Sequence, residues 1–181
     1  NPEQKGTKAA AHHRFLVPPG GRIVVRMRLR PADATSEAFG VEFERTFNQR
    51  IQEAQVFYDS LFPEVMTVEE RVVGRQGYAG LLWSKQFYHY VVSHWLEGDP
   101  AQPKPPERRR QGRNREWQNL FNRDVISMPD AWEYPWFAAW DLAFHCLPLG
   151  LIDPTFAKAN LRLMAREWYM HPNGQLPAYE W

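Results

Sequence analysis

The sequence predicts a mainly α-helical protein with two short strands near its beginning. Three patterns lead to this expectation: an early alternation of apolar and polar residues, an apolar residue at every third or fourth position further on, and helix-capping sequences ahead of two later apolar runs. The chain has 181 residues, 44% of them hydrophobic and 24% charged, which is the composition of a folded globular protein. Its single cysteine excludes an internal disulfide, so a buried core must supply the stability.

The two predicted strands, residues 15–17 and 22–30, flank the turn sequence PPGG. In the second of them apolar side chains alternate with residues that are mostly arginine, and a period of two places the two kinds on opposite faces of a strand. The apolar set is Ile23, Val25, Met27 and Leu29. The arginine face can either bind phosphate groups or form the solvated side of an antiparallel sheet.

Two amphipathic helices are expected next. Residues 36–61 place an apolar side chain at every third or fourth position, and a proline soon afterwards ends the pattern. Thr67 and Glu70 have the spacing of a capping box, in which each side chain accepts a hydrogen bond from the backbone amide of the other residue. We expect the second helix to run from Thr67 to about Val92, with glycines that allow close packing against a neighbour. These glycines are Gly74, Gly77 and Gly80.

A different composition follows these helices. Residues 97–115 hold four prolines and six positive charges, which favours a surface loop over a core. The arginines, with Trp117 close by, suggest a contact with nucleic acid. The formal net charge of +1 argues against that function, since proteins that bind nucleic acid usually carry a basic excess. We therefore expect a solvated loop and no nucleic-acid partner.

Two further helices are expected in the last third of the chain. The first covers residues 134–150, with Pro135 in its opening turn, where the missing N–H of proline costs nothing. The stretch is apolar, but Asp141 near its centre and a mean hydropathy of −0.58 for the chain favour a buried helix over a membrane span. Asp153 and Pro154 supply the cap and the first residue of the second helix.

Asp141 is the first candidate for chemistry. On a helix its neighbours three and four positions away are mostly aromatic or apolar, so its carboxyl group is expected to face an apolar surface. Removal from water disfavours the charged form and tends to keep such a carboxyl protonated toward neutral pH, as a general acid requires. The alternative is a structural aspartate that accepts hydrogen bonds from a neighbouring loop.

The closing loop, residues 174–181, is the second candidate. Its functional side chains are an amide, a phenol, a carboxylate and an indole: Gln175, Tyr179, Glu180 and Trp181. Amide and carboxylate groups can bind sugar hydroxyls while aromatic rings lie against sugar faces, so the loop predicts a carbohydrate-binding site. The histidines and Cys146 have no zinc-ligand spacing, and Cys146 in an apolar helix is expected to be packing and not a nucleophile. We expect neither a metal nor a cofactor.

Three segments closely resemble bacterial members of glycoside hydrolase family 63, glucosidases related to processing α-glucosidase I and to mannosylglycerate hydrolase. They are GLLWSKQFYHYVVSHWLEGDP, SMPDAWEYPWFAAWDLAFHCLPLGLIDPTFAKANL and REWYMHPNGQLPAYEW, and the resemblance covers roughly residues 78–181. An earlier segment, KAAAHHRFLVPPGGRIVVRMRLR, is similar to the end of the β-sandwich domain that precedes the catalytic domain in that family.

The resemblance implies a more specific fold and a division of the chain. The fold is the first part of an (α/α)6 barrel, preceded by the terminal strands of a β-sandwich domain. Residues 1–31 are then the end of the sandwich, residues 32–70 a connecting helical region, and residues 71–181 the first part of the barrel, with residues 97–115 as an inserted loop.

The resemblance also implies an inverting hydrolase that acts on an α-glucoside or an α-mannoside. Asp141 matches the general acid of the family, and the residues expected to bind substrate are Trp136, Gln175, Tyr179 and Glu180. The catalytic base of the family is a later glutamate, beyond residue 181, and Glu180 is not that base. We therefore expect the chain to be a fragment with little or no activity of its own, since inversion needs both carboxyl groups.

Two other classes of function stay open. One is a non-catalytic helical module that binds carbohydrate or protein through its aromatic surface. The other is a nucleic-acid binder that uses the arginines. The resemblance to bacterial proteins and the lack of disulfides favour the bacterial cytoplasm, and no membrane segment is expected.

Overall fold

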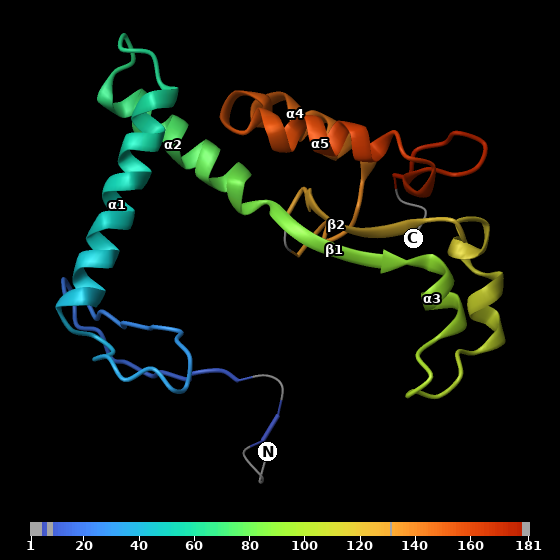
Figure 1. Ribbon diagram of the computed structural model, residues 1–181, viewed down its shortest axis with the longest axis horizontal. Helices are drawn as coiled ribbons and strands as arrows, with labels where there is room; N and C mark the ends of the chain where they lie inside the picture. Colours follow the sequence, from blue (N-terminus) through green and yellow to red (C-terminus); the bar gives the residue numbers. More distant parts are fainter. Residues whose placement is uncertain (1–4, 7–8, 131, 179–181) are drawn as a thin grey trace. The chain divides into compact units, whose positions relative to one another are not determined.

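The computed structural model describes residues 5–6, 9–130 and 132–178, and the chain divides into two compact units, Asn1–Glu53 and Ala54–Trp181 (Figure 1). The described residues form five α-helices and one two-stranded antiparallel sheet. The helices are α1 (Val41–Leu61), α2 (Val68–Trp83), α3 (Val92–Glu97), α4 (Ala139–Ile152) and α5 (Pro154–Met164). The strands are β1 (Lys85–Val91) and β2 (Phe121–Ser127), and the short 3-10 helices are η1 (Glu107–Gln111), η2 (Arg113–Glu116) and η3 (Glu167–Tyr169).

The predicted fold class is wrong in both of its parts. The second unit is not the start of an (α/α)6 barrel, because its helices pack with a two-stranded sheet. Residues 15–17 and 22–30 are not the terminal strands of a β-sandwich, because they form no strand. The alternation in residues 22–30 defines two faces, but a strand also needs a neighbour for its backbone hydrogen bonds, and no described segment pairs with it. Its apolar side chains are exposed as a result, Leu29 completely.

The first unit contains the predicted turn at residues 18–21. Gly20 has the positive φ of 72° that such a turn favours, and a backbone hydrogen bond of 2.9 Å closes it. Three of the arginines that follow, Arg26, Arg28 and Arg30, bind groups of the same unit. Arg26 pairs with Glu44 of α1, and Arg28 donates to two backbone carbonyls of the loop before α1. These arginines therefore have structural partners within the chain.

The start of α2 confirms the predicted capping box. The Glu70 N–H donates to Thr67 Oγ1 over 3.2 Å, and the Thr67 N–H donates to Glu70 Oε2 over 2.8 Å. The long amphipathic helix before it is also confirmed, as α1, which ends at Leu61 as expected and starts at Val41 instead of residue 36.

α2 ends at Trp83, so its expected continuation to Val92 is wrong. Residues 85–91, with the sequence KQFYHYV, form β1 instead, because aromatic and β-branched side chains suit a pleated, half-buried surface. β2 lies antiparallel beside β1, with Lys85 opposite Ser127. The strands thus bring together two parts of the chain that are far apart in sequence.

Residues 92–120, which we call the excursion, connect the two strands and hold α3, η1 and η2. A small buried cluster lies at its base, formed by Val92, Leu96, Trp117 and Leu120. The Val92 N–H donates to the Leu120 carbonyl over 3.1 Å and closes the excursion where it leaves the sheet. Most of residues 97–115 are exposed, which confirms the predicted surface loop.

The main core lies where α4 and α5 pack against each other and α4 contacts β2 and α2 (Figure 1). Its most deeply buried members include Ile126, Phe137, Leu142, Leu149 and Tyr169. The rings of Phe137 and Tyr169 meet edge to face with their centroids 5.0 Å apart. Cys146 is buried in the same core and its Sγ lies 3.6 Å from the Ala157 carbonyl, in agreement with the expected packing role.

The segment before α4 is held in a turn by Asp130. Its carboxylate accepts hydrogen bonds from the backbone amides of Trp132 (2.7 Å) and Tyr134 (3.1 Å). These bonds close a turn ahead of the helix, and α4 starts only at Ala139. The expectation of a helix with Pro135 in its opening turn is therefore wrong.

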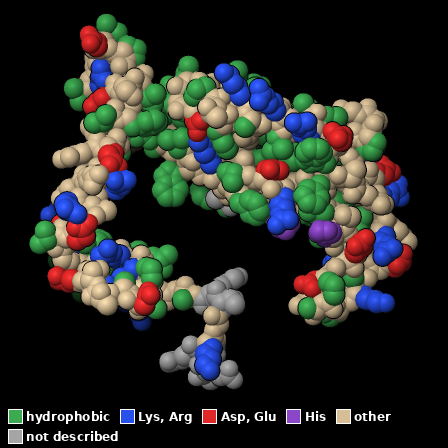
Figure 2. All heavy atoms as spheres, in the orientation of Figure 1, with side chains coloured by type: hydrophobic (Ala, Val, Ile, Leu, Met, Phe, Trp, Pro, Cys, Tyr) green, Lys and Arg blue, Asp and Glu red, His purple; other side chains and the backbone are tan. Residues whose placement is uncertain are grey.

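An apolar stripe lies at the surface of α4. Its members, between 49% and 71% exposed, are Trp140, Phe144, Leu147 and Leu151. Figure 2 shows hydrophobic side chains of the second unit at the surface among the charged ones. Among the described helices, none is both long and apolar enough to cross a membrane.

Gly74 and Gly77 of α2 differ in what surrounds them. A Cβ at Gly74 would lie 2.8 Å from Cε1 of Phe62, while a Cβ at Gly77 would meet no atom within 4 Å. Alanine is favoured over glycine within a helix by about 0.8–1 kcal/mol. We expect Gly77→Ala to raise the free energy of unfolding by about this amount and Gly74→Ala to gain nothing or lose stability, because the Phe62 ring must move. Thermal unfolding of both variants measures the difference. Equal gains in stability would contradict the close approach of a Cβ at Gly74 to the Phe62 ring.

Asp153 caps α5 as predicted. Its carboxylate accepts from the Phe156 N–H (3.0 Å) and from Lys85 Nζ (2.6 Å), and Pro154 is the first helical residue. The Lys85 hydrogen bond and then the Phe156 amide lower the pKa of Asp153. A carboxyl group whose pKa is lowered by folding adds stability above its unfolded pKa, about 3.9, and loses that contribution as the pH falls through the folded value.

We expect Asp153→Asn to lower the free energy of unfolding at neutral pH, and the effect to shrink as the pH falls below the unfolded pKa of aspartate, about 3.9. Asparagine caps a helix as well as aspartate does, so the variant loses only the ion pair with Lys85. Urea unfolding at a series of pH values measures this difference, and Lys85→Met should show the same dependence on pH. A difference that stays constant from pH 7 to pH 2 would contradict the ion pair.

Candidate functional site

Asp141 lies on the first turn of α4, and its side chain is half-buried. Phe137 and Ala138 beside it are buried in the core, but Phe144, one turn later, is 63% exposed. The neighbours of Asp141 are therefore only in part buried, and the site is less enclosed than the sequence suggested. A carboxylate in the first turn of a helix also interacts favourably with the helix dipole.

Trp136, the aromatic residue expected to bind substrate, lies shortly before α4. Its ring meets the ring of Tyr134 edge to face, with centroids 5.4 Å apart. The indole Nε1 of Trp136 is buried and has no hydrogen-bond acceptor within the described part of the chain. Buried polar groups are nearly always paired, so an indole N–H of this kind is suited to a ligand oxygen or a bound water.

The loop at residues 171–178 joins the start of α4. The Pro177 carbonyl accepts from the Ala139 N–H over 3.1 Å, and Pro177 itself is fully buried. Gln175 is exposed in the same loop, and its carbonyl accepts from the His171 N–H over 2.8 Å. The structure thus connects the loop that carries Gln175 with the helix that carries Asp141. The other two predicted loop residues, Tyr179 and Glu180, lie outside the described residues.

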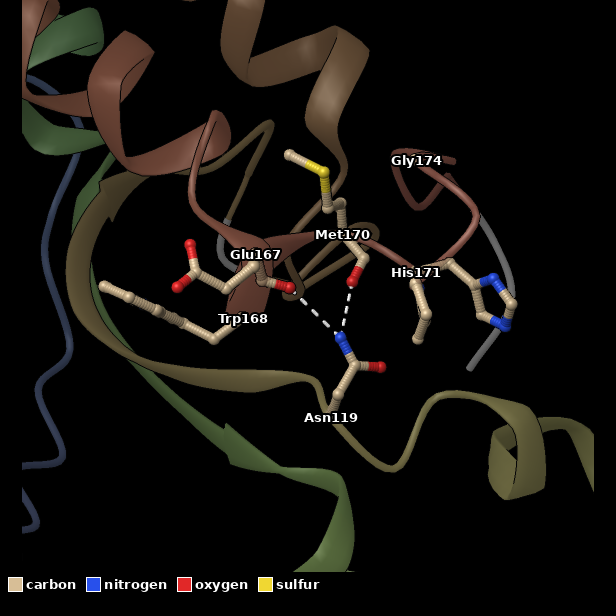
Figure 3. Close-up of a pocket in the computed structure, with 7 residues that line it drawn as sticks. Asn119, Glu167, Trp168, Met170, His171 and Gly174 are labelled. Carbon is tan, nitrogen blue, oxygen red and sulfur yellow. Dashed lines mark hydrogen bonds between the residues drawn. The ribbon is translucent and has the colours of Figure 1, made fainter.

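An open pocket of about 450 Å³ lies against this loop. It is lined by Asn119, Glu167, Trp168, Met170, His171, Pro172 and Gly174 (Figure 3). The Asn119 amide enters from the excursion side and donates to the carbonyls of Glu167 (3.1 Å) and Met170 (2.7 Å), as the dashed lines in Figure 3 show. The sequence analysis missed this pocket, although a carboxylate and an indole just before a predicted turn are a usable signal.

A hydrogen-bonded chain of three side chains was also missed by the sequence analysis. Ser84, Ser127 and His145 are connected by hydrogen bonds: Ser84 Oγ lies 2.8 Å from Ser127 Oγ, which lies 2.7 Å from His145 Nδ1. Burial lowers the pKa of His145, and the nearby Asp141 acts in the opposite direction. Asp141 and His145 are one helical turn apart, so this spacing was visible in the sequence, whereas the two serines come from other elements.

The described residues do not bring together a set of side chains that could bind a metal ion. No group of three or more histidine, cysteine, aspartate and glutamate side chains in the described ranges could hold a metal ion. Burial raises the pKa of Cys146, so its thiol is not activated as a nucleophile.

Comparison with known proteins gives one relative of unknown activity. No family model matches the chain, and no solved structure matches it. The chain is similar to an uncharacterized protein of Saccharomyces cerevisiae, YMR196W, with 48% identity over 191 residues. The match covers 100% of this chain and 18% of the yeast protein, so the chain spans less than a fifth of the length of the curated relative it matches.

Proposed function

We propose that this chain supplies the general acid, Asp141, and part of the sugar-binding site of an inverting glycoside hydrolase. The observation that carries the proposal is the hydrogen bond between Ala139 and Pro177, which joins the first turn of α4 to the loop that carries Gln175. Cleavage of a glycoside requires a proton donor that is held in a fixed position relative to the bound sugar. The acid must protonate the oxygen of the leaving group.

Two further features support the proposal. The indole N–H of Trp136, which has no acceptor among the described residues, offers a donor to a sugar hydroxyl close to the start of α4. The half-buried position of Asp141 lets its carboxyl group reach a ligand while one side stays against apolar surface. The resemblance to family 63 names the substrate class as an α-glucoside or an α-mannoside.

Inversion also needs a base on the opposite side of the sugar, about 6.5–9.5 Å from the acid, to activate water. The proposal places this base in the longer polypeptide, outside residues 1–181. The expected activity therefore belongs to the whole natural polypeptide that contains this chain.

The experiment is the hydrolysis of α-glucosides and α-mannosides by that whole polypeptide, followed by proton NMR. We expect free glucose or mannose that appears first as the β-anomer, since inversion reverses the configuration of the cleaved bond. Initial release of the α-anomer would contradict inversion, and no release from either substrate class would contradict the hydrolase.

A second candidate function is carbohydrate binding without catalysis, and the pocket beside η3 favours it. Glu167 offers a carboxylate and Trp168 a partly exposed ring to one ligand (Figure 3). Binding of an α-glucoside by calorimetry in the absence of any hydrolysis would support this function. In that case Trp168→Ala should weaken binding, while Asp141→Asn should not.

A further inference from the structure

The helix α4 is apolar on two opposite sides. On one side Leu142, Cys146 and Leu149 are buried in the main core. The exposed stripe of α4 lies roughly opposite these residues, because successive side chains of a helix are about 100° apart around its axis. A helix that is apolar on all sides is typical of the interior of a larger protein. The stripe therefore indicates that a further element covers α4.

The stripe has the form of a contact with another helix. Its members, Trp140, Phe144, Leu147 and Leu151, are spaced four, three and four residues apart. At about 100° per residue they lie within roughly 60° of the helix circumference. An arc this narrow, with alternating spacings of three and four, is the seam between two packed helices, whereas a helix face against a broad core spans about 100° or more. The rings of Trp140 and Phe144 meet edge to face with centroids 6.2 Å apart, so part of the seam is preformed.

The positions that flank the seam do little to select a separate partner. In pairs of separate helices, charged side chains at these positions form the ion pairs that decide which chains associate. Of the four flanking residues of α4, three are uncharged: Ala143, Pro148 and Gly150. Only Asp141 can supply a charge. A helix on this seam is therefore better selected by a covalent connection than by ion pairs.

The stripe is also too small for a stable contact between separate molecules. Stable interfaces between proteins use roughly 20–30 residues on each side, and the stripe has four. A helix of the same polypeptide does not need that area, because the covalent connection gives it an effective concentration of up to about the millimolar range. More than four fifths of the yeast relative lies outside the match, so a polypeptide of that length has ample chain to supply the helix.

We propose that the exposed stripe of α4 binds a helix from the part of the same polypeptide outside residues 1–181. That helix carries large apolar side chains at the matching three- and four-residue spacing and crosses α4 at about 20°. In the 181-residue chain by itself the stripe is exposed, so removal of one of its side chains costs little stability there. In the whole polypeptide the same side chains belong to a second core on the other side of α4. The inference does not depend on hydrolase activity.

The test measures the reactivity of a thiol placed on the stripe of the whole natural polypeptide. Leu147→Cys and Leu151→Cys are compared with the matched control Lys158→Cys, at an exposed position of α5. We expect a water-soluble maleimide to modify the two stripe variants at least about ten times more slowly than the control, because a covered thiol reacts only when the structure opens locally. Mass spectrometry of the modified peptides separates these thiols from the other cysteines of the polypeptide. Rates equal to that of Lys158→Cys would overturn the proposal.

A cross-link identifies what covers the stripe. The probe is a photoreactive diazirine analogue of leucine, incorporated at position 147 of the whole polypeptide. We expect it to link to a peptide outside residues 1–181 while the polypeptide still runs as a monomer on a denaturing gel. A covalent dimer would assign the stripe to a second copy, and a link only to residues 1–181 would show that no further helix lies there; either result would overturn the proposal.

The proposed hydrolase and this inference are tested by separate measurements. Absence of hydrolysis would overturn the hydrolase and leave the covering helix standing, since neither the thiol rates nor the cross-link depends on activity. Circular dichroism of each cysteine variant establishes that it is folded. If Leu147→Cys is not folded, the rate for Leu151→Cys decides.

Discussion

Asp141→Asn is expected to lower kcat for an α-glucoside or α-mannoside with an alkyl leaving group by about 10²–10⁴-fold in the whole polypeptide, the usual contribution of a general acid. Asparagine keeps the size and the hydrogen-bonding oxygen of the side chain but has no proton acidic enough to transfer. Because the carboxyl group is half-buried on the first turn of α4, the substitution should leave the fold and KM nearly unchanged.

A comparison of substrates with different leaving groups distinguishes whether Asp141 is a general acid or a structural aspartate. An α-glycosyl fluoride needs far less protonation as its bond breaks, so Asp141→Asn should lose much less activity on the fluoride than on the alkyl glycoside. Steady-state rates on the two substrates measure this ratio. The exposed Glu133→Gln, in the segment before α4, is the matched control and should change neither rate. Equal losses on both substrates would assign Asp141 a structural role.

Phe137→Ala is expected to lower the free energy of unfolding by about 3–5 kcal/mol, the usual cost of emptying a large buried aromatic site. The Phe137 side chain is fully buried and its ring packs edge to face with that of Tyr169. The Tyr169 hydroxyl donates to Asp124 Oδ2 of β2 over 2.9 Å, which limits how far the surroundings can collapse into the cavity.

Phe144→Ala is the matched control for this prediction. It removes the same side chain from the exposed stripe of α4, where it should change the free energy of unfolding by less than about 0.5 kcal/mol. Urea unfolding followed by circular dichroism measures both variants. Similar losses for the two would contradict the placement of Phe137 in the core and of Phe144 at the surface.

The parts of the fold that depend on local hydrogen bonds could be predicted from the sequence. The Thr67 capping box and the Asp153 cap are confirmed, because each needs only residues three positions apart. The sheet could not be predicted in this way. β1 pairs with a strand on the far side of the excursion, and no local pattern states which distant segment will be its neighbour.

The predicted strand at residues 22–30 failed for the same reason. Its alternation satisfies the side-chain requirement of a strand, but backbone pairing requires a second segment, and the described residues supply none. The specific barrel and sandwich came from the resemblance and not from the periodicity. The periodicity itself correctly indicated the helix α1, while the apolar run and the Asp153 cap indicated α4 and α5.

The candidate site likewise contains residues that could be predicted from the sequence and residues that could not. Asp141 and Gln175 were predicted from residue type and near neighbours and Trp136 from the resemblance, and the structure connects the start of α4 with the Gln175 loop. Ser84 and Ser127 could not be identified, because a serine has no distinctive spacing and these two meet His145 only after the sheet and helices assemble. Polar networks that cross several elements are recognisable only in three dimensions.

The excursion between β1 and β2 has a consequence for the covalent continuity of the chain. Its base is closed by the Val92–Leu120 hydrogen bond and by its own buried cluster, while residues 99–105 at its tip are mostly exposed. A protease cut in that tip would leave one strand on each piece, and the paired strands and the core would still hold the pieces together. A chain that is cleaved at this point, or lengthened here by an inserted tag, is therefore expected to retain its fold.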